Sequence, residues 1–164
     1  MRVLVTGSRD WKDVRAIEQA LLAYHPADEQ GFDLPDKPTL VSGACPRGAD
    51  RMAETAARFL GWHIERYPAD WSAPCRPECK PGHRRPTLGG RGGTYCPAAG
   101  NYRNQRMVDA GADVVLAFQL NGSRGTQDCI DRAEAAGLSV IPHHDVSDPA
   151  LVNCEGATTS EEQP

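Results

Sequence analysis

The feature of this sequence that most constrains its fold is the alternation of short apolar runs with segments of helical periodicity. Residues 2–6 (RVLVT) form a β-branched apolar run that stops at a glycine, and residues 39–42 (TLVS) repeat this pattern. Short continuous apolar runs of this kind are typical of buried parallel strands. Apolar residues at helical spacing (Val14, Ile17 and Leu21) follow the first run. The pattern therefore predicts repeated strand–helix units.

The expected elements cover most of the chain. Strands are expected at residues 2–6, 39–42, 62–67, 113–118 and 139–141, and helices at 13–24, 48–60, 98–110 and 126–136. Strands that alternate with helices in this way form a parallel sheet with helices on both faces. We therefore predict an α/β fold with a Rossmann-like parallel sheet of about five strands. An irregular Cys/His insertion interrupts it at residues 72–97, where proline, glycine and cysteine replace aliphatic residues.

Acidic residues are concentrated at the C-terminal end. The chain has 22 acidic and 18 basic residues, and five of the acidic ones lie beyond residue 144, where no Lys or Arg occurs. We therefore predict one domain over residues 1–144 and an acidic disordered tail over residues 145–164. Without that tail the chain is nearly neutral, which argues against a nucleic-acid binder held by bulk charge.

Nothing in the sequence points to a membrane or to export. No apolar run approaches the roughly 20 residues that cross a bilayer. The N-terminus enters the first expected strand without the pattern of a signal peptide. We therefore expect a cytoplasmic protein without membrane association, whose six cysteines stay reduced unless they bind a metal.

Three of the expected strand-to-helix loops have an unusual composition, because each contains glycine, serine and arginine. Glycine lets the backbone approach a ligand, helix N-termini present free N–H groups, and arginine pairs with phosphate. In parallel α/β sheets, ligands bind where these loops leave the strands. The residues that we expect to bind a ligand here are Gly7, Ser8, Arg9, Gly43, Gly48, Ala49, Asp50, Gly122, Gly125 and Thr126.

Each loop taken alone has a simpler interpretation, in which glycine only turns the chain. The presence of three such loops in one short chain favours a binding site over that interpretation. None of them matches G-x-G-x-x-G or G-x-x-x-x-G-K-[ST], so neither a dinucleotide fingerprint nor a P-loop is present.

A fourth candidate element is the helix that begins after the insertion. Small residues at its start would let a ligand approach, and its first turn carries polar side chains. We expect Asn101, Arg103 and Asn104 to bind the same ligand. The alternative for the arginine is a solvated face of the helix or an ion pair with Asp109.

Several stretches of the sequence resemble the SLOG superfamily, in particular its YspA/cpYpsA-related branch of bacteria and their phages. These stretches are VLVTGSRDW, LVSGACPRGAD, YPADW, AGNYRNQRM and ADVVLAF…GSRGTQDCI. The resemblance implies a Rossmann-like domain that binds a nucleotide or a nucleotide-derived phosphate ligand in these loops, as a sensor or a sequestering protein. Homodimers are frequent in the superfamily, although no interface can be recognised in the sequence.

The Lonely Guy phosphoribohydrolases of the same superfamily suggest an alternative, hydrolysis of the N-glycosidic bond of a nucleotide. These enzymes use an arginine and a glutamate, the latter within P-G-G-x-G-T-x-x-E. Here the G-T pair stands at Gly125 and Thr126, whereas the glutamate position falls on Cys129. The candidate catalytic residues are therefore Asp50, Arg103 and Asp128. Stabilisation of a helix N-terminus is an equally weighted role for both carboxylates.

The protein DprA, also of this superfamily, suggests a second alternative, binding of single-stranded nucleic acid. The insertion would supply positive charge, and Trp71, Tyr95 or Tyr102 would stack on bases. Aromatic residues make up only 6% of the chain, so this alternative ranks after nucleotide binding and hydrolysis.

The insertion contains residue types that bind metals. Cys75, Cys79, His83 and Cys96 follow the spacing C-x3-C-x3-H-x12-C, which supplies the Cys3His ligand set of a closed structural zinc site. A segment without an aliphatic core needs some cross-link to be ordered, and zinc supplies one in a reducing compartment. We therefore expect a structural zinc ion, with a flexible loop and incidental cysteines as the alternative.

Two further groups of residues need an interpretation: the basic residues of the insertion, and two cysteines outside it. Five basic residues of the insertion predict a basic lid that overhangs the ligand loops, and they are Arg76, Lys80, Arg84, Arg85 and Arg91. Cys45 and Cys129 lack metal-like spacing, so we expect them to be small packing residues.

Overall fold

The computed structural model describes residues 1–27, 35–87 and 93–144, and it contains every strand and helix expected from the sequence. The strands of the main sheet are β1 (Arg2–Gly7), β2 (Thr39–Ser42), β3 (His63–Arg66), β6 (Val114–Gln119) and β7 (Val140–His144). The helices are α1 (Val14–Leu22), α2 (Ala49–Phe59), α3 (Ala99–Asp109) and α4 (Arg124–Ala135). The predicted α/β fold with a five-stranded Rossmann-like sheet is therefore confirmed.

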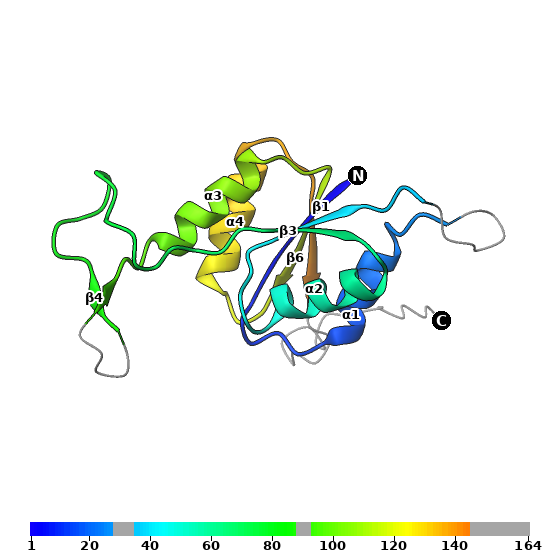
Figure 1. Ribbon diagram of the computed structural model, residues 1–164, viewed down its shortest axis with the longest axis horizontal. Coiled ribbons are helices and arrows are strands. Elements are labelled where there is room, and N and C mark those ends of the chain that lie inside the picture. Colours follow the sequence, from blue (N-terminus) through cyan, green and yellow to red (C-terminus); the bar gives the residue numbers. More distant parts are fainter. Residues whose placement is uncertain (28–34, 88–92, 145–164) are drawn as a thin grey trace, which may run out of the picture.

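The strands of this sheet all run parallel, in the order β3-β2-β1-β6-β7 (Figure 1). The chain adds strands on one side of β1 as far as β3 and then places β6 on the other side. Such a reversal of strand order leaves a crevice outside the carboxyl ends of the two strands where it occurs. Gly7 of β1 and Phe118 of β6 are paired in register at that end.

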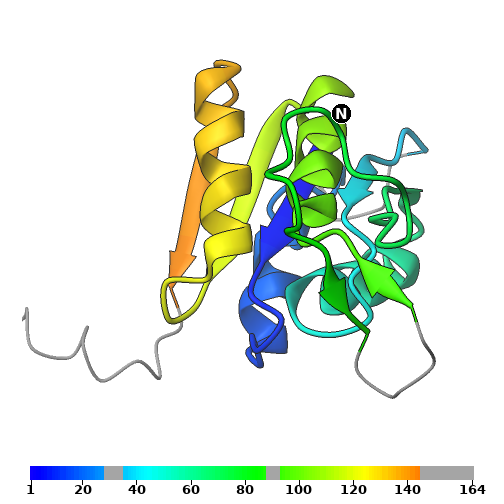
Figure 2. The same ribbon diagram turned by 90° about the vertical axis from the view of Figure 1, so that its left-hand side faces the viewer.

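Successive residues of the central strands pack into two separate cores. Val3 and Val5 of β1 lie in the core with α1 and α2, whereas Leu4 lies in the core with α3 and α4. In β6, Leu116 belongs to the first core and Val115 to the second. This alternation with a period of two residues places a pair of helices on each face of the sheet, as Figures 1 and 2 show.

Most element boundaries agree with the sequence analysis within two residues, and β7 is the main difference. The strand was expected to end at Ile141 and instead continues to His144. The strand continues through Pro142 because β7 lies at the edge of the sheet, where proline is tolerated. His143 stacks on Phe118 with ring centroids 4.6 Å apart, which holds the extended end of β7 against β6.

The irregular insertion projects from the body of the protein beside the start of α3 (Figures 1 and 2). It contains the short antiparallel pair β4 (Arg85–Pro86) and β5 (Thr94–Tyr95), which the sequence did not predict. Arg84 donates hydrogen bonds to three main-chain carbonyls of the insertion, those of Ser72 (3.3 Å), Ala73 (2.7 Å) and Thr94 (2.6 Å). A single side chain thus holds the two ends of the insertion together.

Two further expectations concern the ends of the chain and the membrane. The predicted acidic tail at residues 145–164 lies outside the described residues. Within the ranges that the structure describes, none of the helices has both the length and the apolar character that a bilayer crossing requires.

Candidate functional site

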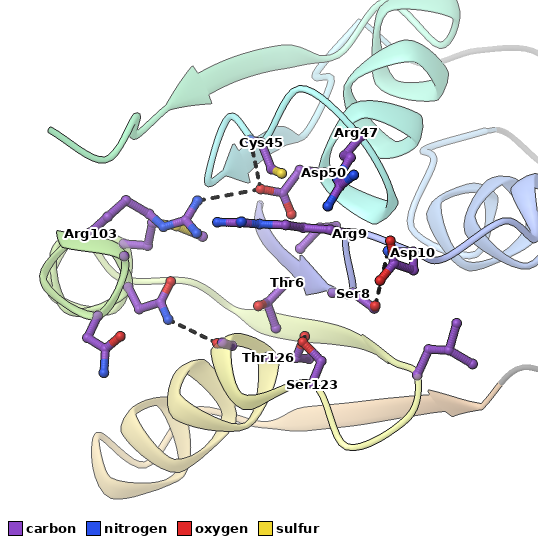
Figure 3. A pocket seen from close by; sticks show the side chains of 18 of the residues that line it. Thr6, Ser8, Arg9, Asp10, Cys45, Arg47, Asp50, Arg103, Ser123 and Thr126 are labelled. Carbon is purple, nitrogen blue, oxygen red and sulfur yellow. Dashed lines mark hydrogen bonds and ion pairs between the residues drawn. The ribbon is translucent and has the colours of Figure 1, made fainter. Parts of the chain in front are cut away.

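A cleft of about 410 Å³ opens at the carboxyl ends of β1 and β6, where the change in strand order predicts a ligand site (Figure 3). Its volume lies within the usual range of small-molecule sites. The loops after β1, β2 and β6 line it together with the first turns of α3. Its lining side chains include Thr6, Ser8, Arg9, Asp10, Cys45, Arg47, Asp50, Trp71, Asn101, Arg103, Asn104, Asn121, Ser123 and Thr126.

The structure brings most of the expected site residues together at this cleft. Those that line it are Gly7, Ser8, Arg9, Asp50, Asn101, Arg103, Asn104, Gly125 and Thr126. Those that lie outside its lining are Gly43, Gly48, Ala49, Gly122 and Asp128. Whether the residues of the first group bind a ligand stays a prediction, because the structure contains none. Ligand binding by the second group also stays a prediction; these residues make other contacts, and Gly43 lines a second cavity that adjoins the cleft.

Gly48 and Ala49 pack the first two loops against each other instead of facing the cleft. The main-chain N–H of Ala49 donates a 3.1 Å hydrogen bond to the carbonyl of Ser8, which satisfies a free N–H of the first turn of α2. Gly48 has a φ of +69° and lies so close to Ser8 and Arg9 that a Cβ would clash with their main chain. The start of α2 is consequently occupied by β1's own loop and is not an open phosphate cradle.

Gly43 is required by its neighbour Arg103. A Cβ at this position would overlap the guanidinium of Arg103 and approach Oδ2 of Asp50 to 2.8 Å. The absent side chain therefore creates the space in which the arginine lies beside the aspartate. Gly122, by contrast, takes a positive φ of +60° in the loop before α4 and has no neighbour within 4 Å of a Cβ in the described structure. It turns the chain.

Arg103 and Asp50 form the electrostatic centre of the cleft. Nη1 of Arg103 lies 3.5 Å from Oδ2 of Asp50, and the same oxygen accepts a 3.1 Å hydrogen bond from the main-chain N–H of Cys45. Burial raises the pKa of Asp50 above its ordinary value, and the charge of Arg103 offsets only part of this effect. Nε of Arg103 is buried and has no hydrogen-bond partner within the described residues.

Two more arginines converge on the same space from other loops. Arg9 extends across the cleft toward Arg103, and Arg47 points toward it from the loop before α2 (Figure 3). Both side chains are exposed. The guanidinium of Arg9 also lies over the ring of Trp71, 5.7 Å from its centroid. Three cations, two from loops and one from α3, therefore face one cavity, which favours an anionic occupant.

The opposite wall of the cleft is the N-terminus of α4. Ser123 precedes this helix, and its hydroxyl oxygen accepts a 3.0 Å hydrogen bond from Thr126. In the described part of the chain, no side chain caps the N–H groups of the first turn. Uncapped N–H groups of this kind can donate to a phosphate. The start of α1 differs, because Asp13 caps it through the N–H of Ala16.

Asp128 connects α4 to α3 and does not face the cleft. Its carboxylate forms a bidentate ion pair with Arg132 (2.9 and 3.0 Å) and accepts hydrogen bonds from Asn101 (3.0 Å) and Asn104 (2.9 Å). Asn104 also donates to the carbonyl of Gly125 in the first turn of α4. These contacts fix the two helices beside each other, and the candidate catalytic role of Asp128 stays a prediction.

The sequence analysis missed several residues that line the cleft, among them Cys45, Arg47, Asn121 and Ser123, and it named Trp71 only as a base-stacking side chain. Arg47 and Ser123 stand in the loops already singled out, so their chemistry could have been recognised. Cys45 was expected to be a packing residue and is instead half-buried in the wall of the cleft. Cys129 is fully buried as expected, and burial raises the pKa of its thiol to about 11.

The described basic side chains of the insertion do not line the cleft, so the predicted basic lid gains no support from them. Of its basic side chains, Arg76, Lys80, Arg84 and Arg85 all lie outside the lining of the cleft, and Arg91 is not among the described residues. Arg84 is directed into the insertion itself, and Arg76 stacks on the ring of Tyr102 at 4.1 Å. Two of these cations, Arg84 and Arg76, thus make local contacts within the insertion and with α3.

The four predicted metal ligands of the insertion do come together. Their donor atoms all lie within 4.8 Å of one another. Nε2 of His83 lies 2.9 Å from Sγ of Cys75 and 3.5 Å from Sγ of Cys96, and Sγ of Cys79 lies 3.9 Å from Sγ of Cys96. Ligand atoms around a tetrahedral zinc ion are about 3.4–3.8 Å apart. This group, the Cys/His cluster, could therefore hold a metal ion.

Comparisons with known proteins add information that the geometry does not contain. The family described as YAcAr, the YspA, cpYpsA-related SLOG family, matches residues 1–73. This segment includes β1, β2, the first two loops of the cleft and Trp71. The Gene 61 protein of Mycobacterium phage D29 is 37% identical over 145 residues, which are 85% of this chain and 94% of the phage protein. The second similarity thus extends well beyond the first.

Proposed function

Because the chain belongs to the YspA, cpYpsA-related SLOG family, we propose that it binds a nucleotide or a nucleotide-derived phosphate ligand as a sensor or sequestering protein. Family membership indicates a nucleotide-related ligand at a general level. The proposed site is the cleft at the carboxyl ends of β1 and β6. The proposed ligand-binding residues are the expected site residues that line this cleft, together with Arg47 and Ser123.

The observation that carries this proposal is the convergence of three arginines opposite the uncapped N-terminus of α4. Arg9 and Arg47 come from two different loops and Arg103 from the first turns of α3, and all three line one cleft with Ser123 and Thr126. Arginines bind phosphate through charge-assisted hydrogen bonds, and a helix N-terminus adds N–H donors and a favourable dipole. A phosphate would bind between the two groups. Nε of Arg103, which has no partner within the described residues, would gain one.

Isothermal titration calorimetry with nucleoside monophosphates, nucleoside diphosphates and ADP-ribose tests the proposal. We expect Arg9→Gln to weaken binding about tenfold, since it removes one charge-assisted hydrogen bond. Arg15→Gln is the matched control, because Arg15 is an exposed arginine of α1 that does not line the cleft. The proposal fails if the wild-type protein binds none of these compounds, or if the two variants weaken binding equally.

Hydrolysis of an N-glycosidic bond is the second candidate function. The observation that favours it is Asp50, a carboxyl group that lines the cleft and whose pKa burial raises, next to the cation of Arg103. A carboxyl group with a raised pKa stays protonated to a higher pH and can donate its proton to a leaving base. An adjacent cation can stabilise developing negative charge. Cys129, at the position of the family's glutamate, is fully buried and supplies no carboxylate.

Release of free base measured by chromatography separates binding from hydrolysis. A protein that hydrolyses its ligand yields base and a ribose phosphate in a ratio of one to one. Asp50→Asn should then abolish release of the base while the ligand still binds. If the wild-type protein binds a nucleotide and releases no base over many hours, the binding function alone remains.

We further propose that the Cys/His cluster binds a structural zinc ion. Cys75, Cys79, His83 and Cys96 supply four ligands, and such a closed set leaves no position for a catalytic water. The metal would cross-link the first part of the insertion to Cys96 at its end, three residues before α3 begins. Native mass spectrometry should report one zinc ion per chain, lost in Cys79→Ser and retained in Cys45→Ser. Full zinc content in the Cys79 variant would contradict the proposal.

A further inference from the structure

A second cavity adjoins the cleft, with a volume of about 540 Å³. Five residues line both spaces, so the two form adjoining parts of one larger site: Arg9, Cys45, Arg47, Trp71 and Arg103. The remaining lining of the second cavity comes from the loop after β2, the segment after β3 and the insertion. A ligand in the cleft could therefore extend past the arginines into this second space.

The two spaces differ in chemistry. The cleft is lined by hydroxyl, amide and carboxylate side chains in addition to its arginines. The second cavity has apolar and aromatic walls instead, formed by Ala44, Pro46, Pro68, Ala69, Trp71 and Tyr95, and its described lining contains no acidic residue. Its cations are the arginines that it shares with the cleft. A ligand that suits both spaces must have a polar anionic end and a flat apolar end.

The aromatic side chains of this second cavity are available for stacking. Trp71 is 38% exposed, and its ring meets that of Tyr95 edge to face, with centroids 6.1 Å apart. Two prolines, Pro46 and Pro68, supply further apolar surface. An exposed tryptophan beside tyrosine and proline offers the surface on which a nucleobase stacks. Such surfaces discriminate weakly among the bases, because every base has a flat π-face.

We propose that the second cavity binds the nucleobase of a nucleoside phosphate whose phosphate occupies the cleft. This inference rests on the proposed function and adds the orientation of the ligand. Arg9 and Arg103 lie at the boundary between the two spaces, beside the ribose and the phosphate. Tyr95 and Thr87 belong to the insertion, so the insertion contributes to recognition of the base rather than to binding of the phosphate.

The experiment compares the four nucleoside 5′-monophosphates with ribose 5-phosphate by isothermal titration calorimetry. Ribose 5-phosphate retains the sugar and the phosphate and lacks only the base. We expect at least one nucleotide to bind about tenfold or more tightly than ribose 5-phosphate, the usual size of one stacking contact. Trp71→Ala and Tyr95→Ala should both remove most of this difference. Tyr95 lines only the second cavity, so Tyr95→Ala should leave the affinity for ribose 5-phosphate within about twofold. Trp71→Phe, which keeps a ring, should restore most of it.

Phe59→Ala is the control for loss of an exposed aromatic side chain, because Phe59 is 94% exposed on α2 and lines neither space. The inference is overturned, and the proposed function stands, if nucleotides and ribose 5-phosphate bind with equal affinity. Equal losses for both compounds in the Trp71 and Tyr95 variants also overturn it. If the wild-type protein binds none of these compounds, the proposed function fails and this inference fails with it.

Discussion

The body of the protein and its insertion are ordered by different interactions. In the body, side chains such as Leu4, Leu116 and Phe118 are almost fully buried between the sheet and its helices. In the insertion, most described side chains are half-buried or exposed, and cohesion comes from Arg84 and the Cys/His cluster. The body is therefore stabilised by the removal of apolar surface from water. The insertion depends on a few directional contacts.

The folding of the body and the local order of the insertion therefore need separate measurements. Truncation of an apolar residue in the body should affect the folding of the whole chain, whereas removal of one ligand or cation from the insertion should act locally. The first turns of α3 join the two regions. Cys96 of the cluster lies just before this helix, and Tyr102 within it contacts Sγ of Cys79 at 2.9 Å.

The largest effect on stability is expected from Phe118→Ala in the body. Phe118 is fully buried, meets Trp11 edge to face at 5.3 Å and stacks on His143. The loss of its ring should lower the free energy of unfolding by about 3–5 kcal/mol, through lost burial and the cavity left behind. Urea denaturation measures this change. Phe59→Ala should alter the same quantity by less than about 0.5 kcal/mol, and equal effects of the two variants would contradict the assignment of the core.

Removal of the metal should loosen the insertion and leave the body folded. If zinc binds the cluster, a chelator should abolish hydrogen-exchange protection in the described parts of the insertion and at the start of α3. Protection of β1 and β6 should persist, and the free energy of unfolding of the body should fall by only about 1–2 kcal/mol. Hydrogen exchange read by mass spectrometry tests both regions in one experiment. Simultaneous loss of protection in β1 would show that body and insertion form one cooperative unit.

A smaller effect is expected from Arg84→Ala. This residue donates to the carbonyls of Ser72, Ala73 and Thr94, and Nη1 also lies 3.8 Å from Sγ of Cys75. Loss of a residue that orients metal ligands costs about 10- to 100-fold in metal affinity. Competition with a chromophoric chelator measures the affinity. Arg85→Ala is the matched control, because Arg85 is the next residue in the chain and its side chain is exposed. An equal loss of metal affinity in the Arg85 variant would contradict the special role of Arg84.

The smallest effect is expected from Glu65→Gln on the surface of the body. Glu65 forms a bidentate ion pair with Arg2, and these hydrogen bonds lower the pKa of Glu65 below its ordinary value. A lowered pKa stabilises the fold above the pKa of unfolded glutamate, and this contribution is lost as the pH falls through the lowered value. Since the pair is partly exposed, the variant should lose less than about 1 kcal/mol at pH 7. The loss should shrink below about pH 4 in denaturation curves.

Much of the fold could be predicted from the sequence, because it depends on patterns within short segments. The continuous apolar run at residues 2–6 predicts a strand that is buried on both faces, and Val3 and Leu4 do lie in opposite cores. A glycine marks the end of each of the first two strands. The extension of β7 to His144 could not be predicted in this way. It depends on pairing with β6 and on the stacking of His143 on Phe118, which are contacts between distant segments.

The candidate site could be predicted in part for the same reason. Loop composition pointed to Arg9 and Thr126, and the start of the helix after the insertion pointed to Arg103; all three line the cleft. The position of Asp128 depends on how α3 packs against α4, so its sequence position beside Thr126 did not reveal that it faces Asn104 and Arg132. Trp71 stands outside the three glycine-rich loops, and only the approach of β1's loop brings it to Arg9.

The strand order also bears on aggregation through the edges of the sheet. A parallel sheet that does not close has two outer strands, here β3 and β7, each with one side of its main chain unpaired. β3 presents His63, Glu65 and Arg66 along its short length, and β7 carries Pro142 in its middle. Charged side chains and proline both hinder the addition of a foreign strand. The two borders of the sheet are thus poor templates for aggregation.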